Sequence, residues 1–165
     1  MELSCATPQK IYAVLPEVSR TQTTLEAPIR VLLVEDNPEA AEMVQFSLDE
    51  DRQQFCMEWS RTIRHAMTRL GEFEVDVVLL DLGLPELSGY RSFRAIQVAS
   101  ARDLPIVIFT ADESILSKEL TLGFGASDYL VKQQCTPARL RQSLRMAVRH
   151  GPPPFDESTP NYGSA

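Results

Sequence analysis

The sequence has few of the residues that build common redox and metal sites. It contains three cysteines, two histidines and one tryptophan among 165 residues. The cysteines are odd in number and lack the spacing of metal ligands, so we interpret them as reduced thiols of a cytoplasmic protein. The two histidines are too few and too far apart in the chain for a histidine-based metal site.

The sequence also lacks an excess of positive charge and any long apolar run. Its formal net charge of -7 argues against nucleic acid or an anionic membrane as the main partner. No segment approaches the apolar length of a transmembrane helix, and the start is no convincing signal peptide. The hydrophobic content of 44% and charged content of 24% are those of an ordinary soluble globular protein.

The two ends of the chain differ from its middle. Residues 1–28 mix Thr, Ser, Pro and Gln without periodicity, and residues 152–165 are polar and rich in proline. We predict a flexible extension at each end, with docking of an arm on a partner or on the domain as the alternative. Residues 29–151 then form one domain, which is long enough for a full hydrophobic core.

Short apolar segments alternate with amphipathic ones through this domain. Five segments have the character of strands: Ile29–Glu35, Phe55–Ser60, Val75–Leu80, Leu104–Ala111 and Asp128–Val131. Each is followed by a segment with helical spacing of apolar residues. Strands alternating with helices predict an α/β fold, a doubly wound parallel sheet with right-handed crossovers. The continuous apolar strands fit a sheet that is buried on both faces.

Particular residues predict where two of the helices begin, end and pack. Asn37 can cap the first helix, whose inward side would include Met43. In the second helix Met67 shares a helical face with other apolar residues, and Gly71 can end the helix.

The carboxyl ends of the predicted strands carry polar side chains. The first strand ends in Glu35 and Asp36, the third is followed by Asp81, the fourth ends near Thr110 and the fifth precedes Lys132. Ligands of such sheets bind outside the carboxyl ends of the strands. Three close carboxylates need a compensating cation, and oxygen ligands suit Mg²⁺. A carboxylate such as Asp81 can also act as a nucleophile and form an aspartyl phosphate.

Four sequence segments resemble the receiver domain of bacterial two-component response regulators, which has a flavodoxin-like sheet with strand order 2-1-3-4-5. They are "VLLVEDNP", "DVVLLDLGLPELSG", "PIVIFTA" and "GASDYLVK". The resemblance covers roughly residues 30–151. It implies that Asp81 is the phosphoacceptor and that Asp36 is a direct Mg²⁺ ligand. Glu35 would act largely through metal-bound water, and the Gly83 carbonyl would complete the metal site.

The resemblance also implies roles for residues near the ends of the fourth and fifth strands. Thr110 and Lys132 would hold the phosphoryl group with help from the Ala111 amide, and Tyr129 would change its packing with Thr110 on activation. Each residue also has an ordinary structural interpretation, as a helix cap, a turn residue, a solvated strand end or a core aromatic. One departure stands out: the family usually has proline after this lysine, whereas Gln133 follows Lys132. We therefore expect a trans peptide and a rearranged loop, which bears on the reach of Lys132.

The partners implied by the resemblance are a sensor histidine kinase or a histidine phosphotransfer protein, and a downstream protein. The output face would combine the fourth helix, fifth strand and fifth helix, and it could also form a homodimer. Its candidate residues are Ile115, Leu116, Lys118, Glu119, Tyr129, Arg141 and Arg145. Because only a tail follows residue 151, we expect a single-domain regulator that signals by protein binding or phosphorelay.

Three other functions remain as alternatives. The first is a receiver-fold interaction module that works without phosphorylation. The second is a phosphatase, which would want an acid/base carboxylate where Gly83 stands. The third is a flavodoxin-type cofactor binder, which is disfavoured because no phosphate-binding loop follows the first strand. We therefore expect a phosphoacceptor signalling domain that catalyses only its own phosphoryl transfer and dephosphorylation.

Overall fold

A computed structural model describes residues 27–51, 53–100 and 104–153, and it shows one five-stranded sheet. All the strands are parallel, in the order β2-β1-β3-β4-β5. They are β1 Ile29–Val34, β2 Phe55–Ser60, β3 Val77–Leu80, β4 Ile106–Thr110 and β5 Asp128–Val131. The predicted fold class and strand order are therefore confirmed. Nearly all of the two predicted flexible extensions lies outside the described residues, so their flexibility stays a prediction.

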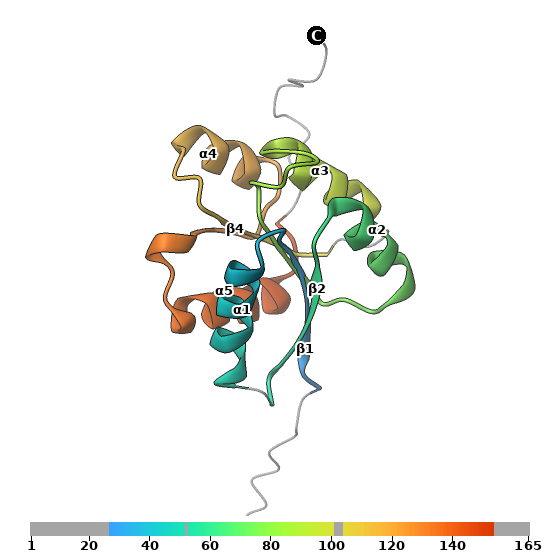
Figure 1. The fold of residues 1–165 in the computed structure, drawn as a ribbon, viewed down its shortest axis with the longest axis vertical. Helices are drawn as coiled ribbons and strands as arrows, with labels where there is room; N and C mark the ends of the chain where they lie inside the picture. Colours follow the sequence, from blue (N-terminus) through green and yellow to red (C-terminus); the bar gives the residue numbers. More distant parts are fainter. Residues whose placement is uncertain (1–26, 52, 101–103, 154–165) are drawn as a thin grey trace, which may run out of the picture.

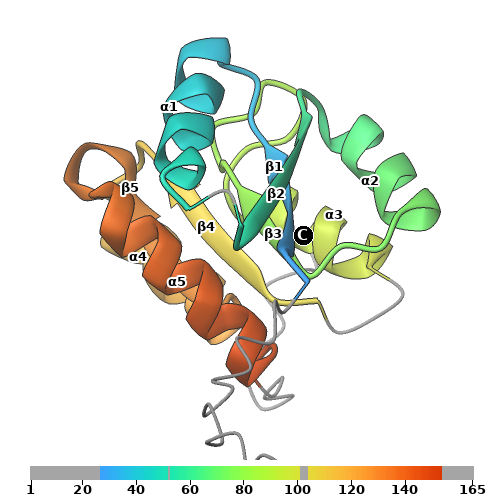
Figure 2. The ribbon, with the colours of Figure 1, turned by 90° about the horizontal axis from the view of Figure 1, so that it is seen from below.

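Helices cover both faces of the sheet (Figures 1 and 2). They are α1 Pro38–Asp49, α2 Ile63–Glu72, α3 Tyr90–Ala99, α4 Ile115–Gly123 and α5 Pro137–His150. Helices α1 and α5 lie on one face, and α2, α3 and α4 lie on the other (Figure 1). In the part of the chain that the structure describes, every helix is too short or too polar to cross a lipid bilayer.

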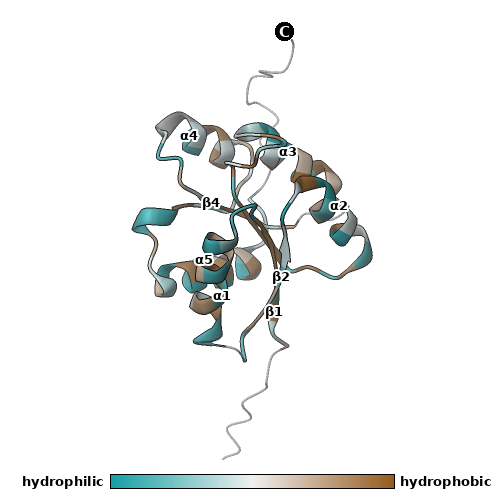
Figure 3. Cartoon of the chain, in the orientation of Figure 1, coloured by the Kyte–Doolittle hydropathy of each residue, from teal (hydrophilic) through white to brown (hydrophobic). Residues whose placement is uncertain are grey.

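The sheet separates the hydrophobic core into two layers. Alternate residues of β1 point to opposite faces: Val31 and Leu33 pack in the layer under α1 and α5, and Leu32 and Val34 pack in the other. Hydrophobic residues are accordingly concentrated along the strands and the inner sides of the helices (Figure 3). This burial on both faces explains why the strands read as continuous apolar runs.

The residues before α1 and α3 fix where these helices begin, and for α1 the capping residue is the one that the sequence predicts. The Asn37 side chain accepts a hydrogen bond from the Glu39 amide at 2.9 Å, with Pro38 in the first turn. Gly89 has φ of +61° immediately before α3, a conformation that favours glycine.

Three local predictions were wrong. Helix α2 continues through Gly71 and ends at Glu72, because a helical glycine does not by itself break a hydrogen-bonded turn. Met43 and Met67 are 48% and 44% exposed, so the apolar stripes of α1 and α2 are narrower than predicted. Strands β3 and β4 begin at Val77 and Ile106, each two residues later than expected, because their pairing with the neighbouring strands starts there.

Candidate functional site

The pairing of β1 with β3 brings the predicted carboxylates together. Val34 lies opposite Leu80 in the parallel register, so the next residues, Glu35 and Asp81, are neighbours at the same sheet edge. Glu35 is 0% exposed and Asp81 is 6% exposed. With Asp36 they offer one oxygen each within 4.8 Å of one another. The predicted convergence of these three side chains is thus what the structure shows.

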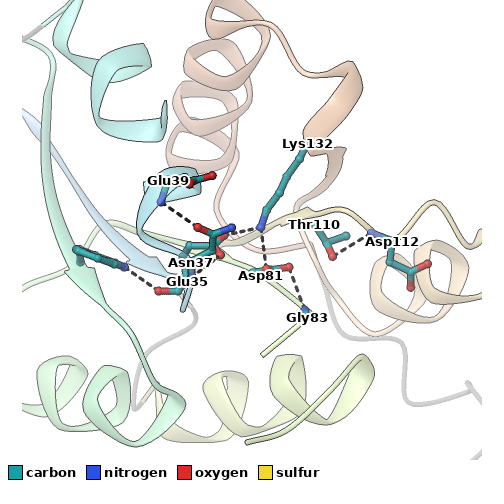
Figure 4. Close-up of polar contacts among 9 residues, drawn as sticks. Glu35, Asn37, Glu39, Asp81, Gly83, Thr110, Asp112 and Lys132 are labelled. Atoms are coloured by element: carbon teal, nitrogen blue, oxygen red, sulfur yellow. Dashed lines mark hydrogen bonds and ion pairs between the residues drawn. The ribbon is translucent and has the colours of Figure 1, made fainter. Parts of the chain in front are cut away.

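Lys132 reaches this cluster from the end of β5. Its ammonium donates to Glu35 Oε2 at 2.5 Å and to Asp81 Oδ2 at 2.7 Å (Figure 4). A short 3₁₀ turn, Lys132–Gln134, follows β5, and the described residues contain no cis peptide bond. The expected trans bond before Gln133 is confirmed, and it does not prevent Lys132 from reaching the acidic residues.

Backbone amides occupy the remaining oxygens of the two buried carboxylates. The Gly83 amide donates to Asp81 Oδ1 at 3.0 Å, and the Asn37 amide donates to Glu35 Oε1 at 3.1 Å (Figure 4). A Cβ at Gly83 would stand 3.4 Å from Asp81 Oδ2, in van der Waals contact with the carboxylate. By contrast, the half-exposed carboxylate of Asp36 makes no hydrogen bond or ion pair within the described ranges.

The charges of the cluster are not balanced, because three carboxylates face one ammonium. Burial raises the pKa of Glu35, the Asp81 charge adds to this, and the hydrogen bond from Lys132 opposes it. Burial alone would lower the pKa of Lys132, but its hydrogen bonds to Asp81 and Glu35 outweigh burial and raise it. A set of carboxylate oxygens with uncompensated negative charge fits a hard divalent cation such as Mg²⁺.

Thr110 and Tyr129 are both connected to Asp112 in the loop after β4. Thr110 is 1% exposed, and its hydroxyl accepts from the Asp112 amide at 3.3 Å. The Tyr129 hydroxyl donates to the Asp112 carbonyl at 2.8 Å. Burial, with the charges of Asp112 and Asp81, raises the pKa of Tyr129 to about 12. Ala111, between Thr110 and this loop residue, is exposed.

Sequence reasoning missed two contacts of the acidic residues. One is the Gly83 amide on Asp81, since the prediction concerned only the carbonyl of this glycine. The other is Trp59, whose indole Nε1 donates to the Glu35 carbonyl at 2.7 Å. The sequence places Trp59 near the end of a predicted strand, which indicates that it lies at the same sheet edge as Glu35. The contact itself depends on β2 lying beside β1, which the pattern of residues does not reveal.

Two residues of the predicted output face lie elsewhere. Arg141 donates to the Ser47 carbonyl at 2.5 Å and to Glu50 at 2.6 Å, and Arg145 donates to Gln54 at 2.9 Å. These arginines therefore connect α5 to α1 and to the segment before β2, so assigning them to the face formed with α4 was wrong.

The other predicted residues of that face have different environments. Tyr129 is buried, whereas Lys118 and Glu119 are exposed on α4. The side chains of Ile115 and Leu116 lie outside what the structure describes.

Comparisons with known proteins agree with this geometry. A family model described as the response regulator receiver domain matches residues 31–145. The cell cycle response regulator CtrA of Brucella ovis is 33% identical over 112 residues, which are 63% of this chain and 44% of that protein. This chain therefore spans less than half the length of that relative.

Solved structures show the same fold. The receiver domain of Klebsiella pneumoniae RstA is 29% identical, with a TM-score of 0.65 over 73% of this chain and 98% of that one. The signal receiver domain of a putative LuxO repressor protein from Vibrio parahaemolyticus is 25% identical, with a TM-score of 0.66 over 74% and 92% of the two chains. From its family match, its flavodoxin-like sheet and its acidic cluster, the chain belongs to the receiver domains of two-component response regulators.

Proposed function

We propose that this receiver domain accepts a phosphoryl group on Asp81 from a sensor histidine kinase or a histidine phosphotransfer protein. The observation that carries the proposal is the position of Asp81. It is buried at the sheet edge, between the Lys132 ammonium and the carboxylates of Glu35 and Asp36. Asp36 and Asp81, the Gly83 carbonyl and, through water, Glu35 would hold Mg²⁺. The ion would balance the negative charge of the phosphoryl group and of the carboxylates.

The chain's own groups account for the transfer. A carboxylate oxygen of Asp81 forms a bond to phosphorus while the phosphorus–nitrogen bond of the donor histidine breaks, and the electron pair returns to the imidazole. Lys132, which already bonds Asp81, moves its ammonium contact to a phosphoryl oxygen. The Thr110 hydroxyl and the Ala111 amide lie at the end of the next strand and would bind further phosphoryl oxygens.

The contacts of Asp112 support a switch role for Thr110 and Tyr129. A Thr110 hydroxyl that turns to the phosphoryl group gives up its 3.3 Å contact with the Asp112 amide. The Asp112 carbonyl holds the Tyr129 hydroxyl, so a shift of this loop alters the packing of Tyr129. Phosphorylation would thereby change the population of two loop conformations.

The signal would pass to a downstream protein or to a second copy of the chain through the face formed by α4, β5 and α5. The exposed Lys118 and Glu119 support α4 as part of this face. In this role the protein acts in the cytoplasm, binds no nucleic acid through this domain and catalyses only its own phosphoryl transfer and dephosphorylation. BeF₃ activation of the similar Klebsiella RstA receiver domain supports a phosphorylation-dependent role.

Incubation with acetyl phosphate and Mg²⁺, followed by intact mass measurement, tests the proposal. We expect a gain of one phosphoryl group that requires Mg²⁺ and is absent in Asp81→Asn. Asp51→Asn is the matched control, because Asp51 contacts Arg145 at 3.5 Å and is remote from the acidic cluster. If the wild type gains no mass, the phosphoacceptor role is refuted in favour of the alternative, an interaction module that works without phosphorylation.

A further inference from the structure

We propose that Trp59 and Arg61 are positioning residues that hold the backbone of Glu35 and Asp36, the acidic pair after β1. By holding this backbone they place the Asp36 carboxylate for cation binding. Trp59 lies on β2, and Arg61 is the residue after this strand. Both contact carbonyl oxygens of the segment after β1. The inference rests on the proposed cation site and assigns residues that hold its backbone.

The first contact fixes the peptide unit that precedes Asp36. The Trp59 indole donates to the Glu35 carbonyl at 2.7 Å. That oxygen belongs to the same planar unit as the Asp36 amide, so the indole fixes the plane from which the Asp36 side chain departs. On the other side of Glu35, its amide donates to the Ser60 carbonyl at 3.0 Å. Two residues at the end of β2 therefore hold the backbone of Glu35.

The second contact concerns the peptide unit that follows Asp36. Its carbonyl accepts a long 3.4 Å contact from the Arg61 guanidinium. Its amide belongs to Asn37 and donates to Glu35 Oε1 at 3.1 Å. The Arg61 guanidinium also lies 5.7 Å from the centre of the Trp59 ring, within the range of a cation–π contact. Both peptide units that flank Asp36 are thus restrained.

These restraints matter because the Asp36 side chain has none of its own. Glu35 and Asp81 are oriented by Lys132 and by backbone amides, whereas the Asp36 carboxylate makes no such contact within the described ranges. Mg²⁺ demands near-ideal octahedral geometry and tolerates little displacement of a ligand. The backbone on each side of Asp36 therefore determines where its carboxylate stands before the cation arrives.

Trp59 also has a packing role, because it contacts the core layer under α1 and α5. Two substitutions separate packing from hydrogen bonding. Trp59→Phe removes the N–H donor and part of the ring. A benzothiophene analogue, incorporated in place of the single tryptophan, keeps the ring shape and replaces only the N–H with sulfur.

The experiment is a calorimetric titration of the unphosphorylated full chain with MgCl₂, well below the unfolding temperature. We expect the Mg²⁺ dissociation constant to rise about 3- to 10-fold in Trp59→Phe and in the analogue, the change that corresponds to the loss of one hydrogen bond. Arg61→Met should have a smaller effect, because its contact is longer. Met57→Leu is the matched control: Met57 packs on the same side of β2 but lies opposite Val31, away from the acidic pair.

The outcomes separate this proposal from the proposed function. Weaker Mg²⁺ binding in the analogue, with Met57→Leu unchanged, supports the positioning role. An unchanged dissociation constant in both Trp59 variants overturns it, even if their thermal stability falls, because Trp59 would then act through packing alone. Wild-type protein that binds no Mg²⁺ overturns the positioning role together with the proposed cation site. If that protein still gains a phosphoryl group on Asp81, the phosphoacceptor role survives.

Discussion

Strands β1 and β3 carry charged residues at both ends, and the two ends balance their charges differently. At the amino-terminal end, the Arg30 guanidinium donates to both oxygens of Asp76, at 3.0 and 2.8 Å, and also pairs with Glu74. The Arg30 amide donates to Asp76 as well, at 2.8 Å. At the carboxyl-terminal end, one ammonium from Lys132 faces three carboxylates.

The difference separates a cluster whose charges are balanced within the protein from one whose charges are not. The hydrogen bonds from Arg30 lower the pKa of Asp76, so this carboxylate is fully satisfied in its charged form. At the opposite end, the pKa of Glu35 is raised, because burial is only partly offset by Lys132. A cluster that keeps uncompensated negative charge in a buried place is one that a cation can stabilise.

Lys132→Met, at the carboxyl-terminal end of the strands, is expected to cause the largest loss of stability. Removing one partner of a buried ion pair leaves unpaired charge and typically costs about 3 kcal/mol of unfolding free energy. We expect that loss at neutral pH without Mg²⁺, and partial recovery with Mg²⁺, because a ligand of the folded state stabilises it. Urea unfolding with and without MgCl₂ measures both, and Lys118→Met on the exposed side of α4 is the control.

The pH dependence of Lys132→Met follows from the same contacts. The raised pKa of Lys132 means that its contribution is complete below its ordinary value and is lost only as the pH rises through the folded value. Protonation of Glu35, whose pKa is raised, removes a charge that Lys132 balances. The stability that Lys132→Met loses relative to the wild type, its deficit, should therefore shrink as the pH falls through the raised pKa of Glu35. A deficit that stays constant down to pH 4 would contradict the charge-balance argument.

Asp76→Asn should have an intermediate effect, at the other end of the strands. The variant keeps the side-chain size but loses the charged acceptor of Arg30, which should cost about 1 kcal/mol after allowance for solvent screening. Because the pKa of Asp76 is lowered in the folded state, its contribution is present above the unfolded value of about 3.9 and is lost as the pH falls through the folded pKa. Unfolding curves of both proteins should therefore differ most at pH 7, and the difference should shrink as the pH is lowered below about 4.

The smallest effect is expected from Glu74→Gln. The Glu74 side chain is 69% exposed, so its pairing with Arg30 is screened by water and should contribute less to stability than the pairing with Asp76. Parallel thermal unfolding of this variant and Asp76→Asn ranks the two carboxylates. An equal loss of stability in both variants would show that Arg30 depends on Glu74 as much as on Asp76.

The sequence predicted the features that follow from periodicity and from chain order. The convergence of Glu35, Asp36, Asp81 and Lys132 depends on where charged residues fall relative to apolar runs, and it was confirmed. The strand order was implied by the resemblance to receiver domains, and it was confirmed as well. The roles of these residues in phosphoryl transfer stay predictions until they are measured.

Features that depend on the rotation of a helix were predicted less well. The helical spacing of Arg141 and Arg145 does not reveal which neighbouring element they face, and the structure turns them toward α1 and the segment before β2. The exposure of Met67 has the same cause, because an apolar residue at the margin of a helical stripe can lie on either side of the buried boundary. Contacts between strands, such as that of Trp59 with Glu35, need the register as well as the pattern.

The hydrogen bond of Trp59 has an optical consequence. Trp59 is the single tryptophan of the chain, so light absorbed and emitted by indole comes from one ring, which donates to the backbone of Glu35. The spectrum of that ring depends on the polarity and hydrogen bonding around its N–H group. The protein thus carries an intrinsic chromophore beside its acidic pair, and a rearrangement of that loop can be followed in real time without attaching a dye.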